Sequence, residues 1–97
     1  MKFIKLLRSD NTDKKWDVFI QDNDGKQHKI SFGSRPYQDF TQHHDEVRKN
    51  LYIQRHRANE DWTQTGILTS GFWAKHLLWN KPSIRSSLAD IRRRFNL

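Results

Sequence analysis

The residues best suited to chemistry with a partner are positively charged. Lys and Arg number 18 against 11 Asp and Glu in 97 residues, and residues 62–97 hold six of these cations but a single acid, Asp90. Charge gathered in one segment attracts polyanions over a Debye length of roughly 8 Å at physiological salt. Arginine predominates, and its planar fork of donors matches phosphate oxygens. We therefore expect DNA or another polyanion to bind at Arg48, Lys49, Arg55, Arg57, Lys81, Arg85, Arg92, Arg93 and Arg94.

The same charges allow a second interpretation. Under this interpretation the Lys and Arg side chains are solvated on the surface or form ion pairs with nearby acids such as Glu60, Asp61 and Asp90. Many basic proteins of this kind bind no polyanion. RNA and anionic lipid also stay open as the polyanion. Binding through phosphates predicts an affinity that falls steeply with salt, with a slope near −0.9 per contact on duplex DNA. We expect little readout of bases, because no helix aims Asn, Gln and Arg at base edges.

A histidine-rich stretch is the only grouping that suggests acid–base or metal chemistry. On a continuous helix Asp45 and His56 would lie three turns, about 16 Å, apart, which one metal ion cannot bridge. His43 and His44 are neighbours and would point about 100° apart, unlike the i, i+4 pair that chelates zinc. The chain has no Cys, which excludes thiolate zinc sites and cysteine nucleophiles. We expect a non-enzymatic protein with no metal, cofactor or small-molecule substrate.

An aromatic segment supports an alternative function. Residues 72–79 are apolar nearly all round, which predicts a short helix that is buried or forms an interface. Core packing is the favoured interpretation for Trp73 and Trp79, whereas Trp62 stands among polar residues. Aromatic side chains are also what protein interfaces concentrate. The alternative is therefore a virion structural protein, a minor capsid or cement component, that docks on neighbouring chains through Trp62, Phe72, Trp73 and Trp79.

The pattern of apolar residues predicts a single α+β domain over residues 1–97. Residues 1–33 form its sheet: Trp16, Val18 and Ile20 alternate with polar residues, and a second alternation follows residues 22–26, whose Asn, Asp and Gly favour a tight hairpin. Residues 2–7 supply a third antiparallel strand. Residues 34–97 form two or three helices packed on the sheet.

Three helices are expected in the second part of the chain. The first is capped by Thr41, has Arg55, His56 and Arg57 in its last turn and is ended by residues 59–61. Its apolar stripe is Val47 and Leu51, extended towards Ala58. The second covers residues 72–79. The third is capped by Ser83, and its apolar residues recur at spacings of four, three and four: Ile84, Leu88, Ile91 and Phe95. The arginines of this last helix are expected together on an open face.

Part of the chain resembles a known family. The resemblance covers about residues 30–95 and rests on Phe32-Gly33, Tyr37, Asp39-Phe40-Thr41, His43, Asp45, residues 52–56, Glu60-Asp61-Trp62, residues 71–82 and Arg94-Phe95. In these residues the chain resembles small uncharacterised proteins of large double-stranded DNA viruses of eukaryotes, of the phycodnavirus and mimivirus kind. Two departures are Arg35-Pro36, where a flexible Gly-containing step is usual, and a less basic run at residues 57–59. The resemblance implies a viral setting and no catalytic residue.

Two features of the sequence, together with the viral setting that the resemblance implies, predict the location of the protein. No stretch approaches the roughly 20 apolar residues of a membrane-spanning helix. The apolar run at the start is interrupted by Lys5 and ended by Arg8, unlike a signal peptide. We therefore expect the protein in the virion or inside the infected host cell, not secreted, with DNA and capsid proteins as its partners.

Overall fold

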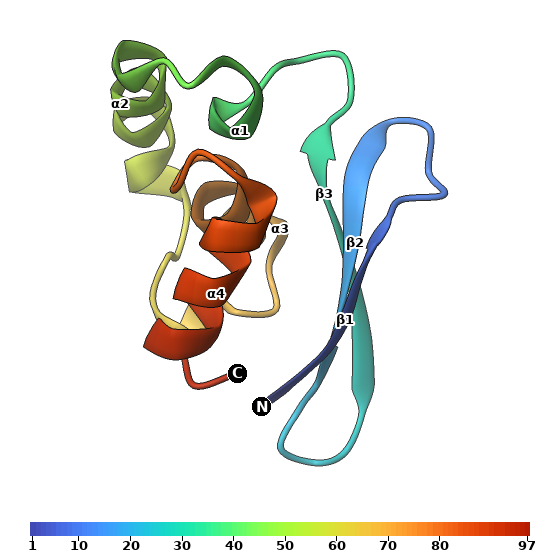
Figure 1. The fold of residues 1–97 in the computed structure, drawn as a ribbon. Helices are drawn as coiled ribbons and strands as arrows, with labels where there is room; N and C mark the ends of the chain where they lie inside the picture. The colour runs from blue at the N-terminus through green and yellow to red at the C-terminus, as the bar shows by residue number, and fades with distance from the viewer.

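Three antiparallel strands form the first part of the structure, a computed structural model that describes residues 1–97. The strands are β1 (Lys2–Arg8), β2 (Lys14–Gln21) and β3 (Gln27–Ser34), in the order β1-β2-β3 (Figure 1). Val18 lies opposite both Leu6 and Ile30, so alternate residues share the face that the helices cover. The predicted hairpin at residues 22–26 is confirmed, with Gly25 at a φ of +86°.

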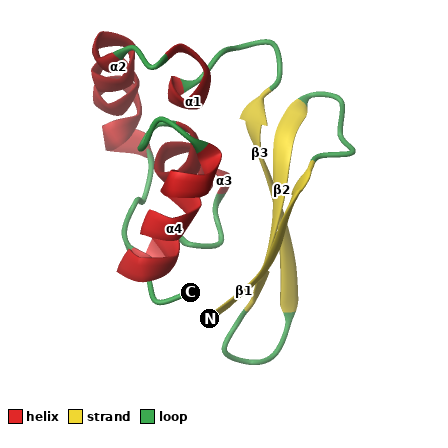
Figure 2. Ribbon diagram, viewed as in Figure 1, coloured by secondary structure: helices red, strands yellow, loops and turns green.

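The helices follow the sheet in sequence and pack on one of its faces (Figure 2). They are α1 (Phe40–His43), α2 (Glu46–His56), α3 (Ser70–Trp73), which continues as one π-helical turn (Ala74–Leu78), and α4 (Ile84–Arg94). Single 3₁₀ turns occupy Arg57–Asn59 and Gln64–Gly66. The sequence-based prediction of an α+β fold is confirmed.

The first predicted helix is broken in two. His44 has a φ of 56°, which ends α1, and the Asp45 side chain accepts hydrogen bonds from the backbone N–H groups of Val47 and Arg48, which begins α2. Thr41 does not cap this helix; Asp39 caps α1 instead and accepts from the Thr41 backbone. Short polar side chains that compete for backbone donors therefore divide the segment.

The core lies between the sheet and the helices that follow α2. Its fully buried large side chains include Phe32 from the sheet, Phe72 and Trp73 from α3, and Ile91 from α4. The predicted stripe of α4 is confirmed, since its other three members pack against this core, and Ser83 caps the helix as expected. The π-helical turn adds Leu77 and Leu78 to the core.

The prediction for the apolar stripe of the first helix is wrong. Val47 is 68% exposed and Leu51 48% exposed on α2, Ala58 is also exposed, and no residue of α2 is fully buried. The helix instead turns Tyr52 towards the rest of the molecule, where its ring stacks on Trp79. An aromatic contact, which helical periodicity of aliphatic residues does not predict, therefore decides which side of α2 faces inward.

Candidate functional site

The largest cavity of the molecule is an open groove between α2 and the end of β3. Its volume is about 690 Å³. We call it the α2 groove, and its lining comes from both halves of the fold: Lys14, Lys15, Phe32, Gly33, Ser34, Tyr37, Gln38, Asp39, Arg48, Leu51, Tyr52, Arg55, His56, Glu60, Ser70, Gly71, Ala74, Leu78 and Trp79. Ligand sites in proteins commonly have this size and this mixture of apolar walls with a few polar groups.

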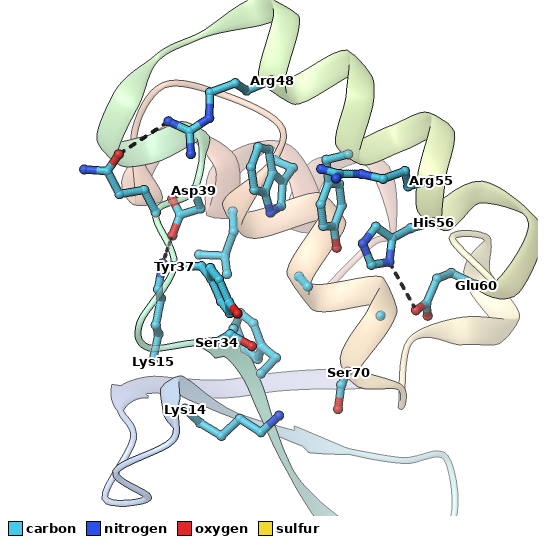
Figure 3. Close-up of a pocket in the computed structure, with 18 of the residues that line it drawn as sticks. Lys14, Lys15, Ser34, Tyr37, Asp39, Arg48, Arg55, His56, Glu60 and Ser70 are labelled. Carbon is cyan, nitrogen blue, oxygen red and sulfur yellow. Dashed lines mark hydrogen bonds and ion pairs between the residues drawn. The ribbon is translucent and has the colours of Figure 1, made fainter.

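Four Lys and Arg side chains line the α2 groove. Arg48 and Arg55 project from α2, and Lys14 reaches in from the opposite side (Figure 3). Arg55 has no hydrogen-bond or ion-pair partner, and Arg48 contacts only the neutral Oε1 of Gln38, at 3.5 Å. Their positive charges are therefore not neutralised by a carboxylate. Arginines seven residues apart on a helix lie about 10 Å apart along its axis, on nearly the same face.

Two carboxylates also line the groove, and both have neighbours. Asp39 pairs with the fourth cation, Lys15, at 2.7 Å and caps α1, so it is buried as a structural anchor. Glu60 packs against Gly71, where a Cβ atom would overlap its carboxylate, and its Oε1 lies 4.0 Å from Nδ1 of His56. The groove thus contains two carboxylates: Asp39, which is neutralised by Lys15, and Glu60, whose neighbour is His56.

A row of stacked rings forms the inner wall of the α2 groove. The Tyr52 ring lies between Trp79, at a centroid distance of 4.4 Å and an interplanar angle of 5°, and His56, at 4.2 Å. Burial, with a smaller contribution from the charge of Glu60, raises the pKa of Tyr52 to about 12. Both faces of Tyr52 are therefore occupied, and this stack fixes α2 relative to the segment that follows α3.

The free aromatic surface of the groove belongs to Tyr37. This side chain is 72% exposed and follows a turn in which its backbone N–H donates to the Ser34 carbonyl. It lines the same groove as the exposed Leu51 and the two arginines of α2. The groove therefore combines uncompensated cations with apolar surface that no other part of the chain covers.

Lys49 and Arg57, two predicted binding residues on or next to α2, lie outside the groove. The Lys49 ammonium donates to the Asn80 carbonyl at 2.7 Å and lies 4.7 Å from the centre of the Phe40 ring. These contacts tie α2 to the loop before α4, which makes Lys49 a structural residue. Arg57 is exposed in the 3₁₀ turn and has no partner.

The arginines of α4 do not form the open, uncompensated face that the sequence predicted. The guanidinium of Arg93 donates to Asp90 at 2.8 Å, and that of Arg94 donates to the same carboxylate at 2.9 Å. Arg92 donates to the carbonyl of Leu97 and covers the ring of Phe3. Spacings of three and four residues place an acid and a base side by side on a helix. Arg85 on this helix, and Lys81 before it, are exposed, and their side chains have neither a hydrogen-bond nor an ion-pair partner.

Asp90 is the centre of a hydrogen-bonded cluster under these arginines. Burial alone would raise the pKa of its carboxyl, but hydrogen bonds from Asn80 and Arg93 and the charge of Arg94 together lower it to about 2. Arg94 also donates to Nδ1 of the buried His76 at 2.9 Å. The other ring nitrogen, Nε2, therefore carries the hydrogen and donates to the Trp62 carbonyl. Burial lowers the pKa of His76 to about 4, so this ring is neutral near pH 7.

The predicted protein interface needs correction at two residues. Phe72 and Trp73 are fully buried, because they fill the space between the sheet and α4, and Nε1 of Trp73 donates to the Ile67 carbonyl. They have no surface to offer a partner. Trp79 is partly buried in the ring stack of the groove, and Trp62 is partly buried with the Lys75 ammonium 5.5 Å from its ring centre.

The histidines and acids do not assemble a metal site. No three His, Asp or Glu side chains of residues 1–97 come together in a way that could hold a metal ion. The Nδ1 atom of His43 accepts from the Asp45 backbone, and its ring lies beside Trp79. None of the helices combines the length and the apolar character needed to cross a bilayer.

Comparison with known proteins gives one match. Residues 4–56, just over half of the chain, match the model of a family of unknown function, DUF5754. The chain belongs to this family. No curated protein and no solved structure matches it. The DUF5754 region runs from β1 through α2, so it supplies Lys14, Tyr37, Arg48 and Arg55 to the groove, whereas α3 and α4 lie beyond it.

Sequence reasoning found the two arginines of the groove but missed Lys14, Tyr37 and Leu51. No spacing connects Lys14 and Tyr37 with α2, because the strand and the loop that carry them meet this helix only in the folded DUF5754 chain, whereas Leu51 could have been found from its spacing to Arg48 and Arg55. The sequence did contain an indication that α4 is neutralised, because Arg93 and Arg94 follow Asp90 at i+3 and i+4. This spacing predicts ion pairs on α4 and leaves the arginines of α2 as the better candidates for binding.

Proposed function

We propose that this protein is a non-enzymatic nucleic-acid-binding protein that holds the phosphate backbone in the α2 groove. The observation that carries the proposal is the pair Arg48 and Arg55, which line a cavity of about 690 Å³ and have no carboxylate partner. Guanidinium groups of this kind bind phosphate oxygens with forked hydrogen bonds. Lys14 faces them across the groove and adds a third positive charge.

The mechanism is neutralisation of phosphates with release of counterions. Each phosphate contact on duplex DNA contributes about −0.9 to the slope of log affinity against log salt. The overall excess of 18 basic over 11 acidic residues assists the encounter, since it draws a polyanion towards the molecule from any direction. The groove then sets where the backbone is held.

The experiment is a salt titration of binding with a matched pair of variants. Fluorescence anisotropy of a labelled random-sequence oligonucleotide gives the affinity between low and physiological salt. The double variant Arg48→Gln/Arg55→Gln should lose affinity and reduce the slope by roughly two phosphate contacts. The control Lys81→Gln/Arg85→Gln removes the same charge from exposed positions outside the groove and should retain most of the slope. Equal losses in both variants, or no binding by the wild-type protein, would exclude the groove as the site.

The viral setting belongs to this proposal. The resemblance of residues 30–95 to proteins of large DNA viruses supports a role in the particle or the infected cell, where viral DNA is the abundant polyanion. Mass spectrometry of purified virions tests the packaged form of this role. Absence of the protein from the particle would restrict the proposed function to the infected cell.

A second candidate, docking on a capsid or other protein, is favoured by an apolar surface of α2 that adjoins the groove. Val47 and Leu51 are exposed one turn apart on α2, so together they form an apolar surface that no other part of the chain covers, and contiguous apolar surface marks interaction sites. This surface replaces Phe72 and Trp73, which are buried. Replacing Val47 with Ser should abolish capture by virion proteins under this candidate and leave oligonucleotide affinity unchanged.

A further inference from the structure

We infer that the α2 groove selects unpaired nucleotides, so that its ligand is single-stranded nucleic acid and not duplex. This inference rests on the proposed function and specifies its ligand. Three observations support it: the order of side chains along α2, the exposed ring of Tyr37 and the shape of the groove.

Cationic and apolar side chains alternate along the face of α2 that lines the groove. Leu51 follows Arg48 by three residues and precedes Arg55 by four, so the three lie on one face with the apolar residue in the middle. A single nucleic-acid strand likewise presents charged phosphates and apolar base faces in alternation, which can match the cationic and apolar side chains of α2. Leu51 can pack on the face of a base only when that base is not stacked within a duplex.

Tyr37 supplies the second apolar surface. It is 72% exposed, and none of its ring contacts is an aromatic pair within the chain, in contrast to Tyr52, whose two faces are covered by Trp79 and His56. Exposed aromatic rings beside cations are the stacking platforms of single-strand binders. In a duplex the bases are already stacked on each other, so Tyr37 would gain no contact from them.

The groove is concave, and its cations lie on both sides. Lys14 projects from the strand side and Arg48 and Arg55 from α2, with Tyr37 between them (Figure 3). A single strand can enter this space with its phosphates towards the cations and a base inside. A duplex is too wide to enter a cavity of about 690 Å³ and would contact only its rim.

The test compares three polyanions of similar total charge: an oligothymidine of about 24 nucleotides, a duplex of about twelve base pairs, and inorganic polyphosphate. We expect the single strand to bind at least tenfold more tightly than the duplex at equal salt. Tyr37→Ala should weaken single-strand binding about five- to hundredfold, which is the range that one lost base stack produces. The same variant should leave polyphosphate affinity unchanged, and Tyr37→Trp should retain single-strand affinity. An oligouridine arm compares RNA with DNA.

The outcomes separate this inference from the proposed function. Equal affinity for single strand and duplex, with no effect of Tyr37→Ala, overturns the selection of unpaired nucleotides and leaves polyanion binding in place. Equal competition by a polyglutamate peptide also overturns it, because the ligand would then be an acidic chain without bases. Failure of all three polyanions to bind removes the proposed function itself.

Discussion

Replacing Asp90 with Asn should destabilise the protein by about 2 kcal/mol at pH 7. The carboxyl of Asp90 is buried, accepts from Asn80, Arg93 and Arg94, and has its pKa lowered from 3.8 to about 2. A difference of nearly two pKa units, at about 1.4 kcal/mol each, gives this magnitude. Because the folded-state pKa lies below the unfolded value, the stabilisation is complete above about pH 4 and is lost as the pH falls through about 2.

Urea unfolding between pH 7 and pH 2 measures this effect. The wild-type protein should lose stability across the window from pH 4 to pH 2, and Asp90→Asn should lack that component. Asp24→Asn is the matched control, since Asp24 is exposed, has no ion-pair partner and undergoes the same change of charge. If Asp90→Asn is as stable as the control and retains the wild-type acid slope, the assignment of the cluster is refuted.

The same variant tests where a polyanion binds. Asp90→Asn removes the carboxylate that neutralises Arg93 and Arg94, so binding through α4 would strengthen markedly relative to Asp24→Asn. Binding in the α2 groove, to which neither arginine contributes, should be equal in the two variants. A marked gain of affinity only in Asp90→Asn would return the site to α4.

Three further perturbations have expected outcomes. Burial lowers the pKa of His76 from 6.5 to about 4, so wild-type stability should fall as the pH drops from 6.5 to 4, and His76→Gln should flatten this part of the curve in urea unfolding; an unchanged curve would contradict the assignment. In Tyr37→Phe the only remaining tyrosine is Tyr52, and its phenolate absorbance should appear with a midpoint near pH 12; a midpoint near 10 would show that the ring stack is open. Glu60→Gln removes the one groove carboxylate without a Lys or Arg partner and should tighten oligonucleotide binding a few-fold, measured by anisotropy, whereas Asp24→Gln should not.

The sheet and α4 could be predicted because their signals are local. Alternation of Val18 and Ile20 with polar residues, the Asp-Gly hairpin and the cap at Ser83 each depend on a few neighbouring residues. The break at His44 depends on a competition between the Asp45 side chain and helix continuation, which residue spacing does not show.

The candidate site was predictable only in part. Arg48 and Arg55 stood out by type, but Tyr37 and Lys14 join them only because α2 and the end of β3 line the same groove. The orientation of α2 follows from the stack of Tyr52 on Trp79, a contact between residues 27 positions apart, and it turns Leu51 outward against its helical pattern. Long-range packing of this kind lies outside the reach of local periodicity.

The way α2 is attached has a consequence for its local stability. Because none of its residues is fully buried, α2 depends on a few contacts, chiefly the stack of Tyr52 on Trp79 and the bond from Lys49 to Asn80, and its local opening would leave the aromatic core covered. One side of the groove is therefore held by fewer contacts than the other, which is built on the paired strand β3. The amides of α2 should therefore exchange with solvent before those of α4, which contributes buried residues to the core.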